Sequence, residues 1–305
     1  MKLVGADLSG MDLSGYDLSY ADLSRACLKD ACLARAKLRG TVLRGAELDG
    51  AEFLGADLRD ADLAQAKARR TGFGRADLRR ADLSAIEAEE ATLAEANLER
   101  VALGGANLNG ARMRDARLCH TDLTGCQLRS VDMVSAVVRK ARFVGCDIRG
   151  SALAHVRDFS TASFLRADIR DVDFSGAYLL RRHILDENYL EEFRRQGRLA
   201  NLVYWLWWLT SDCGRSLVRF GAWVGVFVVL FGLAYAQCPV DYGDHPTALS
   251  PYYFSLVTLS TLGYGDVLPT AGISQALVML QVSIGYLMLA GLTAIFANKM
   301  ARRAE

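Results

Sequence analysis

A period of five governs the first 180 residues and restricts the possible folds more than any other feature of the sequence. Steps of five from Leu8 to Leu153 land on Leu, Phe, Met, Val or Ile at nearly every position, with Ala68 and Ala88 as smaller exceptions. Two residues before each of these positions stands a mostly small residue. Neither the helical nor the strand period accounts for this pattern. We therefore expect each unit to form one side of a coil, with one large and one small side chain inside, and the coils to stack at the inter-strand spacing.

One short phrase recurs throughout this region, as in Ala6–Gly10, Ala56–Asp60 and Ala106–Gly110. These phrases resemble the repeats of the pentapeptide-repeat family. The resemblance implies that residues 1–180 form a right-handed quadrilateral β-helix with four units in each coil.

The repeat slips by one residue near its end. After Leu153 the next large apolar residue in the pattern is Phe159, and steps of five resume at Phe164. We expect the extra residue, within 155–158, to bulge a corner of one coil.

Residues 1–180 carry 26 basic and 26 acidic side chains, so this region has no net charge. Some pentapeptide-repeat proteins imitate DNA and bind topoisomerases, which requires a strongly acidic surface. The charge balance argues against that function and against nucleic acid as a partner. We expect the repeat domain to promote assembly, to transmit the signal of an unknown cytosolic regulator, or to act only as a spacer.

Residues 181–212 change character and predict two helices. Apolar residues recur at helical spacing from Ile184 to Phe193, and Glu187 is among the charged residues assigned to the opposite face. This helix is expected to cover the open end of the last coil, because an uncovered β edge invites association. Gly197 is expected to end it.

An aromatic segment follows, and we expect it to form an amphipathic helix at the level of the lipid headgroups. A helix buried in a protein core is the alternative. The aromatic residues are Tyr204, Trp205, Trp207 and Trp208.

Residues 213–305 contain two apolar segments that are long enough to cross a bilayer, so they predict a membrane domain. We place the first span at about 217–237, with Ser211 or Asp212 capping its helix, and the second at about 273–298. Neither span carries spaced arginines, so a built-in voltage sensor is not expected.

The placement of lysine and arginine orients the two spans. Between Cys238 and Gly272 there is no Lys or Arg, and the titratable residues there include Asp244 and His245. Both termini and the β-helix are therefore expected in the cytoplasm, with the chain as a multi-pass protein of the plasma (inner) membrane. The basic residues that flank the spans include Arg215, Arg219, Lys299, Arg302 and Arg303.

A potential pore segment lies between the spans. Pro251 opens a short apolar stretch, which predicts a re-entrant pore helix over residues 251–261. The stretch runs directly into Thr261, Leu262, Gly263, Tyr264, Gly265 and Asp266. With Thr258 before it, this run strongly resembles the pore of potassium channels, so these six residues would form the selectivity filter.

The resemblance implies that backbone carbonyls replace the water around a dehydrated K⁺. The K⁺ ligands would be the carbonyls of Thr261, Leu262, Gly263 and Tyr264, together with the Thr261 hydroxyl. Gly263 and Gly265 permit the positive φ that turns alternate carbonyls toward one axis. Asp266 would attract cations at the outer mouth. Support for the filter, including the ring of Tyr264, would come from Tyr253, Phe254 and Thr258.

Two residues depart from the usual pattern of this family. Leu262 stands where valine is commonest, and Val257 occupies a pore-helix position that is acidic in some members. We expect K⁺ selectivity to survive the change at Leu262. A weakly selective cation channel is the alternative function.

One chain supplies one filter strand, so the resemblance implies a homotetramer surrounded by membrane lipid. In the second span Gly285 is the predicted hinge and Gly291 the alternative. Residues beyond the hinge at helical spacing would form the inner constriction. They are Leu289, Thr293, Phe296 and Ala297.

The sequence contains no nucleophile–base set, metal cluster or phosphate loop, so we do not expect an enzyme. No cofactor is expected, because K⁺ would be the permeant ion. The seven cysteines show no metal-ligand spacing and are expected to be reduced and structural.

Overall fold

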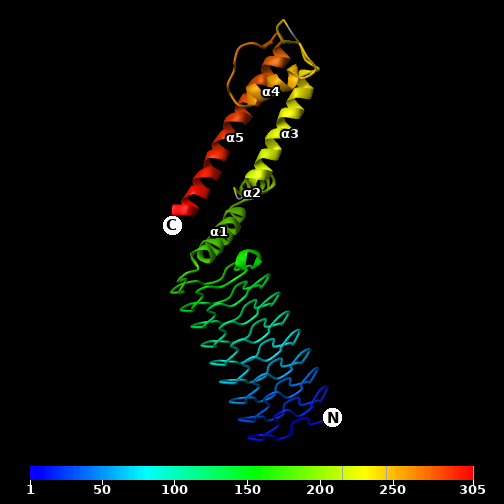
Figure 1. Cartoon of the computed structure of the whole chain (residues 1–305), viewed down its shortest axis with the longest axis vertical. Coiled ribbons are helices and arrows are strands. Elements are labelled where there is room, and N and C mark those ends of the chain that lie inside the picture. Colours follow the sequence, from blue (N-terminus) through cyan, green and yellow to red (C-terminus); the bar gives the residue numbers. More distant parts are fainter. Residues whose placement is uncertain (215, 245, 305) are drawn as a thin grey trace. The chain divides into compact units, whose positions relative to one another are not determined.

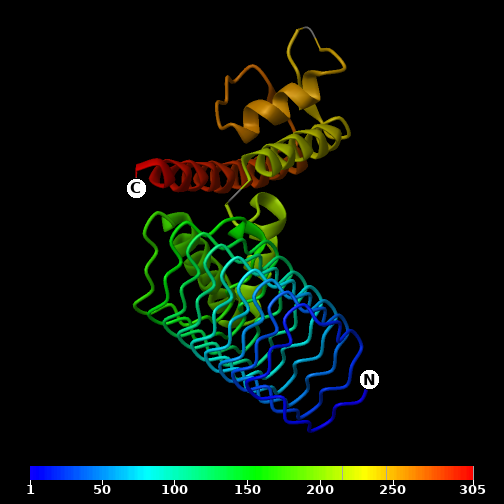
Figure 2. The same ribbon diagram turned by 60° about the horizontal axis from the view of Figure 1, so that its bottom comes forward.

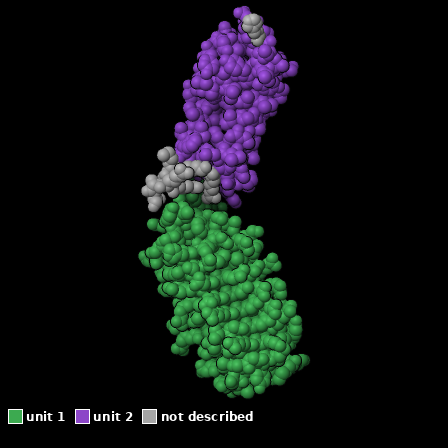
Figure 3. Space-filling model, viewed as in Figure 1, with its two compact units in different colours: residues 1–192 green, residues 193–305 purple. Residues whose placement is uncertain are grey.

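The computed structural model describes residues 1–214, 216–244 and 246–304, with side chains up to residue 297. The chain forms two compact units, residues 1–192 and 193–305 (Figure 3), and each is described by itself. Some residues used to predict the orientation lie outside the described part. They are Arg215 and His245, together with the side chains of Lys299, Arg302 and Arg303.

The first unit is a β-helix of stacked coils (Figures 1 and 2). Parallel bridges join residues that are 20 positions apart, so each coil contains four units of five residues. The first bridges of the four ladders are Lys2↔Asp22, Asp7↔Cys27, Asp12↔Cys32 and Asp17↔Lys37. The β-helix is thus confirmed, whereas its right-handed quadrilateral course stays a prediction.

The interior of the coils holds the two side chains that each unit was predicted to bury. Leu23 and Ala26 are both fully buried, for example. Aromatic residues of successive coils stack on each other, with ring centroids 5.1 Å apart for Phe53 and Phe73. The last residue of each unit has a left-handed backbone, as at Gly10 with φ +65°, which explains why glycine is frequent there.

Polar side chains at the small inward position bond to the coil before them. The Thr71 hydroxyl donates to the carbonyl oxygen of Leu48 at 2.8 Å, and the Cys126 thiol to that of Leu103 at 2.9 Å. Hydrogen bonding to Cys146 and burial raise the pKa of the Cys126 thiol far above its ordinary value, so it stays protonated. None of the described cysteines forms a disulfide.

The slip in the repeat begins within the predicted segment 155–158 and extends beyond it. Arg157 still pairs with Val137, 20 residues earlier, whereas Ser163 pairs with Arg142, 21 residues earlier. The extra residue is therefore accommodated between Arg157 and Ser163, by a left-handed Asp158 and the short helix η1 (Phe159–Thr161). Asp158 belongs to the predicted segment, whereas the continuation of the bulge into η1 was not predicted.

The helix α1 (Tyr178–Arg195) covers the last coil and belongs to the first unit up to Glu192, which extends that unit beyond the predicted limit at residue 180. Leu180 and Ile184 are fully buried in the core of the coils. The Glu187 carboxylate accepts from the backbone N–H of Phe164 at 2.7 Å. Glu187 was predicted to lie on the face opposite the apolar residues, but it faces the coil edge, because the N–H groups of the last coil have no further coil to bond.

Charged side chains on the coil surface pair with neighbouring coils. Arg80 donates to both oxygens of Asp60, each at 2.7 Å. The Asp147 carboxylate accepts hydrogen bonds from Arg149 and Arg129. These bonds hold the pKa of Asp147 well below its usual range, and the bond from Arg149 has the larger effect. Because the folded pKa is depressed, this stabilisation is present at neutral pH and is lost in strong acid.

Within its described residues, the second unit contains four complete helices and one short pair of strands. The helices are α2 (Arg198–Ser211), α3 (Leu217–Tyr235), α4 (Ser250–Leu259) and α5 (Gly272–Ala304). The strands β1 (Val240–Asp241) and β2 (Leu268–Pro269) pair antiparallel. Two segments are apolar and long enough to cross a membrane, with mean hydropathies of 2.1 for Leu217–Tyr235 and 1.8 for Gly272–Ala297.

The start of α3 differs from the prediction. Ser216 caps the helix, since its hydroxyl accepts from the N–H of Arg219 at 3.1 Å. The predicted caps have other roles. Asp212 ends α2 with a left-handed φ of +53°, and the Ser211 hydroxyl accepts from the N–H of Gly214. Among the described residues, Ser216 has the extended backbone of an N-cap, whereas Asp212 is left-handed.

Candidate functional site: a pore loop between two apolar helices

The helix α4 and the segment that follows it form a loop between the two apolar helices (Figure 1). Pro251 stands at the start of α4, where its missing N–H costs no hydrogen bond. The helix ends at Leu259, two residues earlier than predicted, and residues 260–266 then lead to β2. Two backbone bonds hold this turn to the end of the helix, from Thr261 N–H to the Thr258 carbonyl at 3.1 Å and from Leu262 N–H to the Val257 carbonyl at 3.2 Å.

The backbone of residues 261–265 alternates in handedness. The φ angles are +59° at Thr261, +50° at Gly263 and +77° at Gly265. The two glycines adopt the positive φ that their type favours. Thr261 also adopts it, which was not predicted and costs about 1–2 kcal/mol for a residue with a side chain.

Side chains of this loop fall into two groups. Leu262 is 62% exposed and Tyr264 is 67% exposed in the single chain. In contrast, the Tyr253 hydroxyl donates to the Asp266 carboxylate at 2.8 Å, and the Phe254 ring lies against Tyr235 with centroids 4.8 Å apart. The α4 aromatics therefore contact Asp266 and α3 within one chain, whereas Tyr264 stays largely exposed there.

A buried polar network that sequence reasoning missed joins α3, α4 and α5. The Tyr235 hydroxyl donates to Gln281 Oε1 at 2.8 Å. Gln281 Nε2 donates to the carbonyl and the hydroxyl oxygens of Ser255 at 2.9 and 2.7 Å. All three side chains are fully buried. A glutamine inside an otherwise apolar span was the available signal, since a polar group there needs a partner.

The two glycines proposed as hinges have different surroundings. Gly285 is buried, and a Cβ placed on it would lie closer to the Leu259 carbonyl oxygen than any real Cβ contact. A Cβ on Gly291 would meet only the Phe220 ring, at an ordinary 3.5 Å. Gly285 therefore lets α5 approach the end of α4. The side chains predicted for the inner constriction are exposed in the single chain; they are Leu289, Thr293, Phe296 and Ala297.

Comparison with known proteins agrees with this division of the chain. The family profile described as "Ion channel" matches residues 223–302. The profile "Pentapeptide repeats" matches in eight copies between residues 2 and 150. The chain is a pentapeptide-repeat domain joined to an ion-channel module. A search of curated proteins found no match to the chain.

Solved structures that resemble the chain include pentapeptide-repeat proteins. HetL, involved in heterocyst differentiation regulation in Nostoc sp. strain PCC 7120, is 27% identical over 58% of this chain and 86% of its own, with a TM-score of 0.26. QnrB1, a plasmid-mediated fluoroquinolone resistance protein, is 18% identical over 56% of this chain and 94% of its own, with a TM-score of 0.39. A thylakoid-lumen protein of Arabidopsis thaliana is 27% identical over 46% of this chain and 70% of its own, with a TM-score of 0.22. With these TM-scores, none of the three informs the function of this chain.

Among the residues that the structure describes, no group of three or more His, Cys, Asp or Glu side chains could bind a metal ion.

We expect Gly285→Ala to damage the channel module and Gly291→Ala to be tolerated. The first substitution must displace α5 from the Leu259 carbonyl, and such overpacking costs about 1–3 kcal/mol. The second needs no displacement. The measurement is the yield of assembled protein on size-exclusion chromatography and the initial rate of cation flux in liposomes. Equal yields and rates for the two variants would contradict the close contact at Gly285.

A second expectation concerns Gln281. Gln281→Leu keeps a side chain of similar size but removes its polar atoms. The polar atoms of Ser255 and Tyr235 then lose this partner, at a cost of about 1–3 kcal/mol each. We expect a lower thermal stability of the module and a smaller flux, measured by a detergent thermal shift and by the liposome assay. Ser283→Leu is the control, because the Ser283 hydroxyl bonds only to its own helix, at the Met279 carbonyl. If both leucine variants behave alike, the network does not hold the loop.

Proposed function

We propose that the chain forms a potassium-selective channel as a homotetramer. The observation that carries this proposal is the alternating left-handed backbone at Thr261, Gly263 and Gly265, at the end of a short helix between two apolar helices. Four such strands around an axis would surround a dehydrated cation with carbonyl oxygens. The K⁺ ligands would be the carbonyls of residues 261–264 with the Thr261 hydroxyl.

A homotetramer also accounts for the exposed side chains of the loop. Channels of this kind assemble in a membrane, and Tyr264 and Leu262 would be buried against neighbouring subunits. Large apolar side chains that stand exposed beside a polar loop suit such an interface. Tyr253 would support the filter through Asp266, which lies at the outer mouth and would attract cations.

The chain would lie in the plasma (inner) membrane with both termini and the repeat domain in the cytoplasm. The distribution of basic residues supports this orientation. No Lys or Arg lies between Cys238 and Gly272, whereas several precede the first span and follow the second. The coils of the repeat domain would follow the right-handed quadrilateral course of their family. Gating would involve Gly285 or Gly291 and a constriction beyond them on α5.

Reversal potentials in opposing K⁺ and Na⁺ gradients test the selectivity. We expect the purified protein in planar bilayers to follow the K⁺ equilibrium potential and to be blocked by barium. Gly263→Ala should abolish the selective current, because alanine disfavours the left-handed φ of +50° there. Gly221→Ala, on α3 with open space around it, is the matched control. A current that follows neither ion alone would favour the weakly selective cation channel, and a strictly monomeric protein would refute the tetramer.

We further propose that the repeat domain promotes assembly. Because α1 completes the core of the coils, residues 1–196 should be removed together, so that Leu180 and Ile184 are not left exposed. We expect this deletion to lower the yield of tetramer and to leave the reversal potential unchanged. A change in open probability at constant yield would instead indicate regulation by a cytosolic signal, and no change in either would make the domain a spacer.

A further inference from the structure

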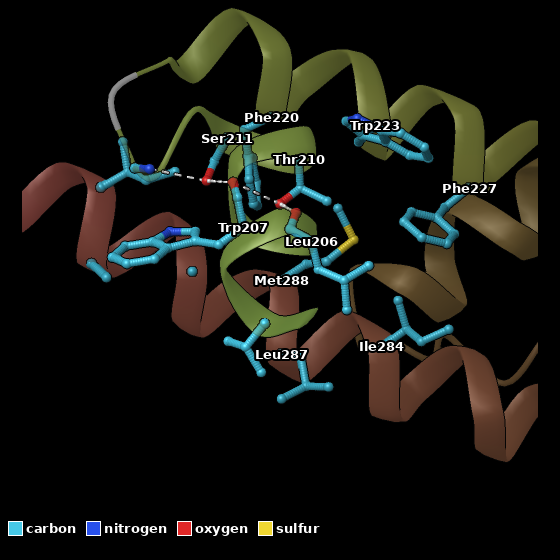
Figure 4. Close-up of a pocket in the computed structure, with 15 residues that line it drawn as sticks. Leu206, Trp207, Thr210, Ser211, Phe220, Trp223, Phe227, Ile284, Leu287 and Met288 are labelled. Carbon is cyan, nitrogen blue, oxygen red and sulfur yellow. Dashed lines mark hydrogen bonds between the residues drawn. The ribbon is translucent and has the colours of Figure 1, made fainter. Parts of the chain in front are cut away.

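An apolar cavity of about 590 Å³ lies between α2, α3 and α5 within the second unit (Figure 4). Ligand cavities in proteins measure about 300–1,000 Å³, so this one is large enough for a ligand. Phe220, Trp223 and Phe227 of α3 line one side, and Ile284 and Met288 of α5 line another (Figure 4). Trp207 and Leu206 of α2 complete the wall.

Three polar side chains around the cavity already use their donor hydrogens within the protein. The Thr210 hydroxyl donates to the Leu206 carbonyl at 2.8 Å. The Ser211 hydroxyl donates to the Trp207 carbonyl at 3.1 Å, and Trp223 Nε1 donates to the Leu209 carbonyl at 3.1 Å. Most of the other lining residues are apolar, so the wall favours a hydrocarbon and disfavours a polar molecule.

The cavity also lies where hydrocarbon is the surrounding solvent. Its residues on α3 belong to the first two-thirds of a helix that can cross a membrane, and those on α5 belong to the other such helix. The aromatic helix α2 stands at the end of this layer, with Trp205 and Trp208 about half exposed, as suits the headgroup level.

A cationic side chain stands next to the cavity on α3, one turn before Trp223. The Arg219 guanidinium lies over the Trp208 ring, 5.5 Å from its centroid, and its Nη1 donates to the Trp208 carbonyl at 3.1 Å. Nη1 is 3.9 Å from the Asp212 carboxylate, and the Arg219 side chain remains 42% exposed. Arginine carries more N–H donors than this contact uses, and its planar fork suits phosphate oxygens.

From these observations we propose that the cavity binds one acyl chain of a membrane phospholipid, whose phosphate contacts Arg219. The bound chain fills the space that separates α2 from Met288 and Gly291 of α5, so it packs the two helices together. Occupancy would then affect the part of α5 near the predicted constriction. This last consequence rests on the proposed function, whereas binding of the lipid does not.

Native mass spectrometry of the full chain, purified in mild detergent, tests the binding. We expect the wild type to retain about one phospholipid per subunit, since the cavity suits a single chain. Ala294→Trp places an indole in the cavity and should abolish retention. Val218→Trp is the matched control, because Val218 is 85% exposed on α3 and does not line the cavity, and it should retain the lipid.

Arg219→Gln tests the phosphate contact without filling the cavity, and it decides the matter if Ala294→Trp fails to fold. Loss of one charge-assisted contact should lower retention about tenfold. A wild type that retains no phospholipid, as when a second subunit fills the cavity, would overturn the proposal. Equal retention by the Ala294→Trp and Val218→Trp proteins would overturn it too.

Ion selectivity is measured on the same preparations. Retained lipid with no K⁺-selective current would refute the proposed function and leave the lipid site intact. A K⁺-selective current from protein that retains no lipid would refute the lipid site and support the proposed function.

Discussion

The need of every buried backbone N–H and C=O group for a partner shapes both parts of this chain. In the repeat domain each coil supplies the partners of the next, as where the Leu8 N–H donates to the Cys27 carbonyl at 2.7 Å. The stack must therefore be closed by something other than a coil. The helix α1 does so with side chains, since Glu187 accepts from Phe164 N–H and Asn188 from Arg166 N–H. The face of α1 that covers the last coil therefore closes the β-helix with polar side chains as well as apolar ones.

In the channel module the proposed function has the opposite need, because the proposed filter would require carbonyls that have no hydrogen-bond partner within the protein. The N–H groups of Thr261 and Leu262 are bonded to α4, which fixes where the loop begins. The alternating φ then keeps the following carbonyls from closing a helical turn. Rigidity comes from outside the loop, from the Tyr253–Asp266 bond at one end and from Gln281, which binds α4 through Ser255.

Features with a local signature could be predicted from the sequence. The period of five implies the coils, two uncharged stretches imply the apolar helices, and the run from Thr261 to Asp266 implies the loop. Features that depend on three-dimensional neighbours could not. The side of α1 that Glu187 faces is decided by the open coil edge, and the N-cap of α3 by the extended backbone of Ser216. The partners of Gln281 lie 26 and 46 positions away in the chain.

The contact at Gly285 bears on how such a pore could open. Its backbone lies against the Leu259 carbonyl, so a bend of α5 at this point would move the end of α4 and the loop attached to it. A bend at Gly291 would be free of that contact, because only the Phe220 ring lies near. Phe220 and Gly291 also line the cavity beside α2. Motion at Gly285 would thus be coupled to the filter, whereas motion at Gly291 would be coupled to α2 and to whatever fills that cavity.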